Sequence, residues 1–119
     1  MAEQRTYVEE VLAVLQTEFR PEQRATSERK LKRRLREKKL GPYDQAVIDA
    51  VRAFKDDVQA EIGYPVDSPF HTSSEGRFAA MADWDVDGLR SHFRSRHPDV
   101  PGDEIDWFVP WAIYLYYLR

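Results

Sequence analysis

The chain has 119 residues, of which 42% are apolar and 33% are charged, proportions typical of a globular protein. This length predicts a single domain over residues 1–119 with its own hydrophobic core. The absence of cysteine excludes disulfides, thiolate metal sites and a cysteine nucleophile. Four glutamates interrupt the first 19 residues, and the longest apolar run, residues 107–118, is shorter than the roughly 20 residues of a membrane span. We therefore expect a cytoplasmic protein with neither a secretory signal nor a membrane helix.

The net charge of −3 conceals a strongly uneven distribution along the chain. Residues 24–39 carry nine Lys and Arg against two Asp and Glu, a local charge of +7. The remaining residues carry nine Lys and Arg against nineteen Asp and Glu, a charge of −10. Because separated charges of opposite sign direct association, this pattern favours a protein with a charged partner.

Helical periodicity dominates the first half of the chain. Residues 3–19 form an amphipathic pattern that ends before Pro21, and the basic segment then runs to Leu40, where Gly41-Pro42 supplies a stop. A third helix is expected over residues 43–62. The apolar positions of the first pattern are Val8, Val11, Leu12, Leu15 and Phe19, and those of the third are Tyr43, Val47, Val51, Phe54, Val58 and Ile62.

After a loop over residues 63–74, shorter helices are expected in the second half. Ser74 can cap a short helix, and a further helix precedes His97-Pro98. Asp103 can cap the last one, which runs towards Leu118. The apolar residues of these three helices are Phe78, Met81 and Ala82; Leu89 and Phe93; and Ile105, Trp107, Phe108, Trp111, Tyr114, Leu115 and Leu118.

The C-terminal segment WAIYLYYL is also rich in strand-forming residues, and Pro110 removes a hydrogen bond from a helix interior. No second convincing strand exists to pair with it, so we expect a helix in which Pro110 forms a kink or a new first turn. The predicted fold is therefore all-α, a compact single domain of five or six helices with the aromatic C-terminal helix in the core. An alternative role for this aromatic segment is a homodimer interface.

The basic segment is the leading functional candidate. Like charges stand four residues apart at Arg29 and Arg33, and at Lys30 and Arg34, a spacing that is unfavourable on an isolated helix. An anionic partner, either a nucleic-acid backbone or an acidic protein, would relieve this repulsion. The candidate contact residues are Arg29, Lys30, Lys32, Arg33, Arg34, Arg36, Lys38 and Lys39. The alternatives are a solvated helix and a structural or self-associating protein whose basic helix docks on acids such as Asp99, Asp103, Glu104 and Asp106.

Sequence-specific reading of DNA by a helix-turn-helix is not indicated. The segment after Gly41-Pro42, which would be the reading helix, carries five acidic residues against only Arg52 and Lys55. The chain also contains no asparagine, a common reader of adenine. The sequence therefore predicts phosphate contacts with little base readout.

The hexapeptide Asp83-Trp84-Asp85-Val86-Asp87-Gly88 matches the first half of an EF-hand calcium loop. The twelfth position of such a loop needs a bidentate glutamate, but Arg94 stands there. Asp83, Asp85 and Asp87 are thus weak metal candidates, and a degenerate calcium-binding domain is a third functional alternative. The competing interpretation is a helix boundary, with Asp85 or Asp87 as the cap.

No pattern of residues indicates an enzyme. His92 and His97 are five apart and do not form the helical zinc pair. His71 lies beside Thr72, Ser73 and Ser74 in the 63–74 loop, but no nucleophile motif accompanies it. No glycine-rich phosphate loop is present, so we expect neither a cofactor nor catalysis, and a small binding protein is the leading prediction.

Overall fold

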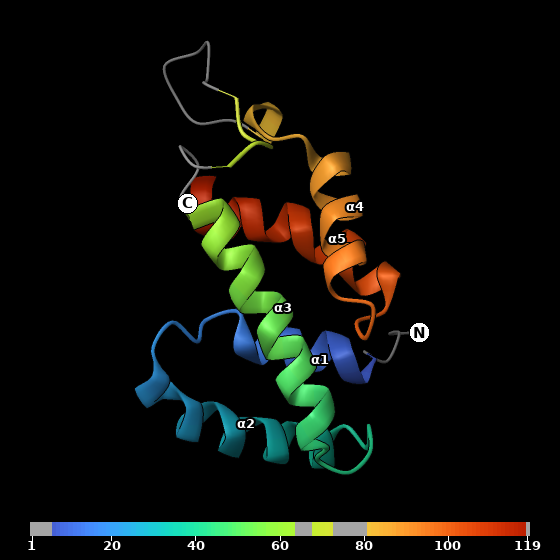
Figure 1. The fold of residues 1–119 in the computed structure, drawn as a ribbon. Coiled ribbons are helices and arrows are strands. Elements are labelled where there is room, and N and C mark those ends of the chain that lie inside the picture. The colour runs from blue at the N-terminus through green and yellow to red at the C-terminus, as the bar shows by residue number, and fades with distance from the viewer. Residues whose placement is uncertain (1–5, 64–67, 73–80, 119) are drawn as a thin grey trace. The chain divides into compact units, whose positions relative to one another are not determined.

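The computed structural model describes residues 6–63, 68–72 and 81–118, and its regular elements are helical (Figure 1). Among the described residues, three short helical turns accompany five α-helices. The α-helices are α1 (Tyr7–Leu15), α2 (Arg24–Glu37), α3 (Gln45–Gly63), α4 (Val86–Arg96) and α5 (Gly102–Ile113). The turns are the 3-10 segments η1 (Pro21–Gln23) and η3 (Met81–Asp83) and the π-helical η4 (Tyr114–Leu118). Within the described ranges no strand forms, and only one isolated bridge pairs His71 with Trp84. The all-α prediction is confirmed.

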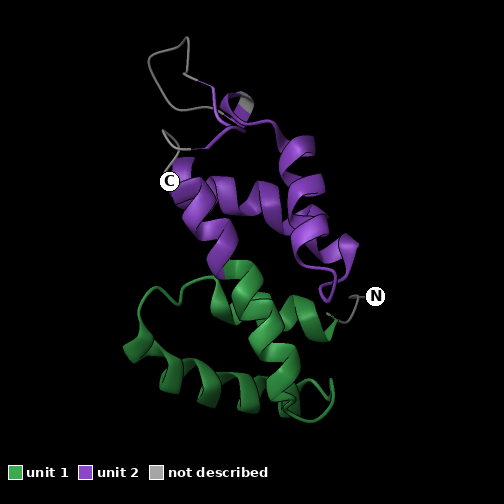
Figure 2. Cartoon of the chain, in the orientation of Figure 1, with its two compact units in different colours: residues 1–55 green, residues 56–119 purple. Residues whose placement is uncertain are grey.

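The chain divides into two compact units, residues 1–55 (unit 1) and residues 56–119 (unit 2) (Figure 2). The boundary falls inside α3, so the first part of that helix belongs to unit 1 and its last part to unit 2. No helix among the described residues is long and apolar enough to cross a membrane.

In unit 1, α1 follows the predicted stripe only as far as its last turn. Val11, Leu12 and Leu15 are fully buried, but the helix ends at Leu15 and leaves Phe19 57% exposed. The backbone N–H groups of Phe19 and Arg20 donate to the side chain of Gln23, at 2.7 and 2.9 Å. This contact turns the chain before η1, so the prediction of a stripe continuing to residue 19 is wrong.

The helices α2 and α3 agree more closely with their patterns. Leu31 and Leu35 of α2 are buried, and Gly41 adopts a φ of +124°, a conformation that favours glycine, after the helix has ended. The side chain of Asp44 accepts from the first N–H groups of α3, which gives that helix an N-terminal cap. On α3 the buried apolar residues are Ile48, Val51, Phe54, Val58 and Ile62.

In unit 2, α5 is the main core element, as expected for the aromatic C-terminal helix. Pro110 lies inside α5 without ending it, and the N–H of Tyr114 donates to the carbonyls of Pro110 and Trp111. From Tyr114 onwards the chain widens into η4. The N-cap position is Pro101 and not Asp103, which lies in the first turn instead. The buried residues of α5 include Ile105, Phe108, Val109, Ala112 and Ile113.

The segment before α4 differs in part from the expected short helix. Ser74 and Phe78 lie outside the described residues, and Met81–Asp83 forms a 3-10 turn. Asp85 caps α4 by accepting from the N–H of Gly88 at 3.0 Å, so the prediction of a helix boundary at this hexapeptide is confirmed.

Candidate anion-binding helix

The C-terminal half of α2 is fixed to α1 by one buried carboxylate. The side chain of Glu10 has no exposed surface and lies 3.3 Å from Arg34 Nη1 and 3.2 Å from Lys38 Nζ. Both cations are partly exposed, yet each is neutralised inside unit 1. Two of the eight predicted contact residues, Arg34 and Lys38, therefore have a structural partner in Glu10. This partner was not identified from the sequence.

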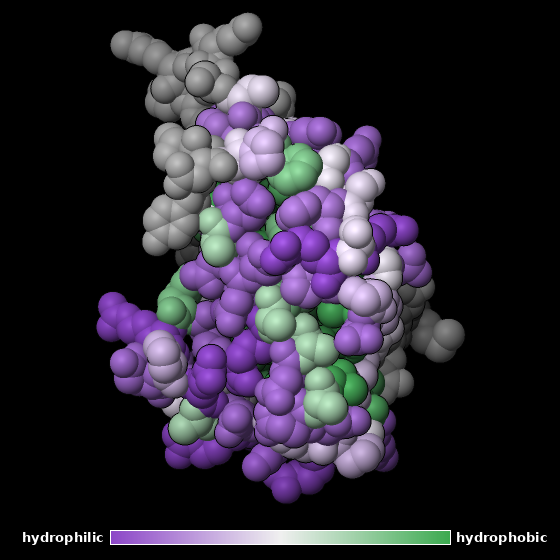
Figure 3. All heavy atoms as spheres, viewed as in Figure 1, coloured by the Kyte–Doolittle hydropathy of each residue, from purple (hydrophilic) through white to green (hydrophobic). Residues whose placement is uncertain are grey.

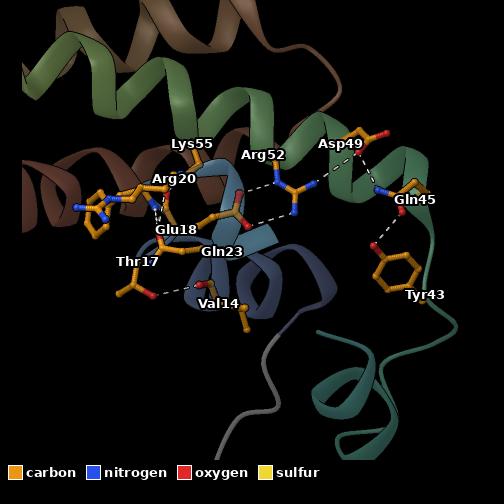
Figure 4. A network of polar contacts seen from close by, with 11 residues as sticks. Val14, Thr17, Glu18, Arg20, Gln23, Tyr43, Gln45, Asp49, Arg52 and Lys55 are labelled. Atoms are coloured by element: carbon orange, nitrogen blue, oxygen red, sulfur yellow. Dashed lines mark hydrogen bonds and ion pairs between the residues drawn. The ribbon is translucent and has the colours of Figure 1, made fainter. Parts of the chain in front are cut away.

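A second buried carboxylate, that of Glu18, joins the segment after α1 to α3 (Figure 4). Its two oxygens accept from Arg52 of α3 at 2.8 and 3.2 Å, and Lys55 donates to its backbone carbonyl. Burial alone would raise the pKa of Glu18. The hydrogen bond from Arg52, the side chain of Ser27, and the charges of Arg52 and Lys55 together outweigh burial and lower the pKa. Glu18 thus fixes the chain between α1 and η1 against α3 at one buried point.

Tyrosines support the α2–α3 connection in the same unit. The hydroxyl of Tyr7 donates to the carbonyl of Pro42 and accepts from the N–H of Asp44, each at 2.9 Å. Lys32 Nζ lies 5.0 Å from the ring centroid of Tyr43, within range for a cation–π contact. These contacts hold one flank of α2 against the segment that leads into α3.

The side of α2 opposite its buried residues is lined by arginines. Ser27, Leu31 and Leu35 are buried at three- and four-residue spacing. Arg29, Arg33 and Arg36 repeat at the same spacing on the outer side and are exposed. We call these three residues the arginine row. Mainly hydrophilic residues cover the lower part of the view in Figure 3, where α2 lies.

Most of the outer cations of α2 are not neutralised within the part of the chain that the structure describes. Arg33 lies 4.0 Å from Glu37, but both side chains are about three-fifths exposed, so this pair contributes little. No ion pair forms there at Arg29, Lys30, Arg36 or Lys39. The helix therefore has an inner side whose charges are matched and an outer side with surplus positive charge.

Two of the four acids considered in the sequence as docking partners for this helix, Asp106 and Glu104, have contacts within unit 2. Asp106 Oδ1 accepts from Arg94 Nε at 3.0 Å, and its backbone carbonyl accepts from Arg90. Glu104 is buried and accepts from the indole N–H of Trp107. These contacts tie α4 to α5.

The three carboxylates of the EF-hand-like hexapeptide do not converge. Asp83 accepts from the hydroxyl of Tyr117 at 2.6 Å, Asp85 caps α4, and Asp87 lies 3.4 Å from Arg90. Among the described residues, no group of three His, Cys, Asp or Glu side chains is placed to hold a metal ion. The contact with Asp83, together with burial, raises the pKa of Tyr117 to about 12.

The three histidines all lie in unit 2 and each has a polar neighbour. His71 Nε2 is 3.1 Å from the Tyr117 hydroxyl, and His97 Nε2 is 2.7 Å from Asp57 Oδ2. His92 lies 3.8 Å from Glu61. Thr72, beside His71, donates to the carbonyl of Asp83, while Ser73 and Ser74 lie outside the described residues.

The aromatic C-terminal segment keeps part of its surface exposed. Trp111 and Tyr114 are 40% and 47% exposed, and their rings stack with centroids 5.4 Å apart. The homodimer interface expected here stays a prediction. No family model matches the chain, and neither a curated protein nor a solved structure shows significant similarity to it.

Proposed function

We propose that this chain is a non-enzymatic binding protein that presents the outer side of α2 to the phosphate backbone of a nucleic acid. The observation that carries the proposal is that acidic side chains neutralise the inner cations of α2 but few of its outer cations. Glu10 neutralises Arg34 and Lys38 on the inner side, whereas among the described residues the outer cations form one ion pair, the exposed contact of Arg33 with Glu37. A polyanion supplies the missing counter-charges and gains entropy by releasing its own condensed ions.

The anchoring of α2 supports the same function. Glu10 fixes the C-terminal end of the helix through Arg34 and Lys38, and the buried Leu31 and Leu35 lie on its inner side. A helix held in this way presents its outer cations without first having to fold, so binding does not cost the ordering entropy of a disordered basic tail. We place the protein in the cytoplasm, in line with the absence of cysteine.

Fluorescence anisotropy with a short DNA duplex tests this proposal. Four or five phosphate contacts give a slope of log affinity against log salt of about −4 on B-form DNA. Replacing Lys32, Arg33 and Arg36 together with glutamine should weaken binding and flatten the slope. Absence of binding at about 50 mM salt, where such contacts are strong, would refute the proposal.

A matched control separates α2 from general electrostatics. Arg33→Gln and Arg94→Gln change the net charge equally, and both residues are exposed arginines on helices. Only Arg33 lies on α2, so only its replacement should weaken duplex binding.

An acidic protein is the second occupant that the same surface fits, because carboxylates also neutralise exposed arginines. Poly-glutamate serves as the probe for it. Saturable binding of poly-glutamate together with failure to bind the duplex would replace the nucleic-acid proposal with this alternative.

A further inference from the structure

The cations of α2 fall into two geometric classes around the buried Leu31. Lys30 and Lys32 precede and follow Leu31 in sequence, so they leave the helix about 100° to either side of it. Arg29 and Arg33 are two residues away in each direction and stand about 160° from Leu31, on the far side. Arg36 joins them there, one turn beyond Arg33. The lysines therefore flank α2 and the arginine row forms its outermost line.

This arrangement fits a groove better than a flat phosphate surface. An α-helix with its side chains is about 10–12 Å wide, and the major groove of B-form DNA is about 12 Å wide. When the arginine row faces the groove floor, Lys30 and Lys32 point to opposite walls, where the two phosphate strands lie. Each class of cation then meets the chemistry that suits it, since lysine binds phosphate as a point charge and arginine presents a planar fork.

Arginine at the groove floor has a preferred base. Its guanidinium donates two parallel hydrogen bonds to O6 and N7 of guanine, the commonest specific contact in the major groove. The row from Arg29 to Arg36 is about 10 Å long, which corresponds to about three base steps of 3.4 Å. We infer that α2 enters the major groove of duplex DNA and that Arg29, Arg33 and Arg36 favour sites containing guanine, which departs from the sequence-based expectation of little base readout.

Two features of α2 narrow the class of nucleic acid further. The helix contains no aromatic residue, so its outer side offers no ring on which the bases of a single strand could stack. The deep, narrow major groove of A-form RNA does not admit side chains to the bases. Duplex DNA rich in G·C pairs is therefore the expected ligand, and duplex RNA of the same sequence should bind more weakly.

This inference rests on the proposed function, and its test separates the two. Binding of the full chain is measured at about 100 mM salt on three duplexes of equal length: a G·C-rich DNA, a DNA of A·T pairs alone, and an RNA of the G·C-rich sequence. We expect about tenfold tighter binding to the G·C-rich DNA than to either of the others, as one good bidentate contact provides. Equal affinity for all three duplexes, with a normal salt slope, would overturn the inference and leave phosphate binding intact. Loss of all binding would remove both.

Two double substitutions distinguish the role of the arginines from that of the lysines. Arg29→Lys with Arg33→Lys keeps every charge but removes two guanidinium groups. The ratio of affinities for the G·C-rich and A·T duplexes should therefore fall towards one, while the salt slope stays near that of the native chain. Lys30→Gln with Lys32→Gln should weaken binding to every duplex by a similar factor, lower the slope by about 1.8 and leave the preference intact. A G·C preference that survives the arginine substitutions overturns the inference. Far-UV circular dichroism checks that both variants keep the native helix content.

Discussion

Each unit contains one basic helix, and the two helices differ in how far their cations are paired with acidic groups. In unit 2, each Arg and His of α4 and its C-cap has an acidic or carbonyl partner. Arg90 and Arg94 contact Asp106 of α5, Arg96 and His97 contact Asp57, and His92 faces Glu61. In unit 1, the described residues give α2 buried acidic partners on its inner side, whereas on its outer side they give only the largely exposed pair of Arg33 with Glu37.

The difference teaches that a run of cations is informative only once its counter-charges are known. Residues 1–55 carry thirteen Lys and Arg against nine Asp and Glu, a net charge of +4, whereas residues 56–119 carry five against twelve, a net charge of −7. In unit 2 the acids outnumber the cations, and the cations of α4 serve to hold helices together. In unit 1 the cations are in excess and collect on one helix. This difference supports a structural role for the cations of α4 and the binding role that we propose for α2.

The largest expected effect on stability comes from the buried carboxylate of Glu18. Glu18→Gln leaves the buried Arg52 with the largely exposed Asp49, 3.7 Å away, as its remaining ion-pair partner among the described residues, and should lower the free energy of unfolding by about 3 kcal/mol. Asp106→Asn removes the same charge from the exposed contact with Arg94 in unit 2 and should cost far less. Urea denaturation of both variants measures the difference. Similar losses would mean that the two kinds of contact contribute equally to stability.

A second variant removes the counter-charge of the inner side of α2. Glu10→Gln should cost about 2 kcal/mol, because Arg34 and Lys38 are partly exposed and regain water. The same change removes the carboxylate that neutralises Arg34, so the salt slope for duplex DNA should steepen by up to about 0.9 through this residue. An unchanged slope in a variant that remains folded would show that Arg34 lies out of reach of the ligand.

The sequence predicts local features of this chain better than it predicts pairing between helices. The α3 stripe and the cap at Asp85 follow from residues a few positions apart, whereas α2 ends at Glu37, with Lys39 at a φ of +53°, before the predicted stop at Gly41-Pro42. Glu10 and its partners Arg34 and Lys38 are more than 20 residues apart. A glutamate beside an apolar stripe has the same local pattern whether it faces water or a buried cation.

The end of α1 shows the same limit. Phe19 extends the apolar spacing of that helix, but Gln23 turns the backbone and Glu18 is buried against Arg52 in its place. The burial of Glu18 in place of Phe19 depends on tertiary contacts, which here override the helical spacing of apolar residues. The division of the α2 cations into inner and outer sets likewise requires the position of α1.

The pH dependence of stability offers a test of the counter-charges in unit 2. Burial would raise the pKa of Asp57, but hydrogen bonds from His97 and Arg96, with their charges, outweigh it and lower the pKa below its ordinary value. Because this pKa is lower in the folded state, the stability it contributes is present above the unfolded value of about 3.9 and is lost as the pH falls through the folded value. Asp57→Asn should therefore cost about 1 kcal/mol at pH 7 and progressively less below pH 4. Thermal unfolding across this range measures it, and a constant cost would contradict the assignment.

The smallest expected change in stability accompanies an informative change in binding. Glu37 is the acid paired with the arginine row, and its contact with Arg33 is largely exposed. Glu37→Gln should alter the free energy of unfolding by no more than about 0.5 kcal/mol. The same substitution removes a charge that repels phosphate, so affinity for duplex DNA at low salt should rise several-fold. The control is Asp87→Asn, which removes a negative charge that is even more exposed, 94% against 62% for Glu37, from the pair with Arg90 on α4. If binding depends on the surplus charge of α2, only Glu37→Gln strengthens it. If both variants strengthen it equally, affinity follows the net charge of the chain, and α2 loses its special role in the comparison between the two basic helices.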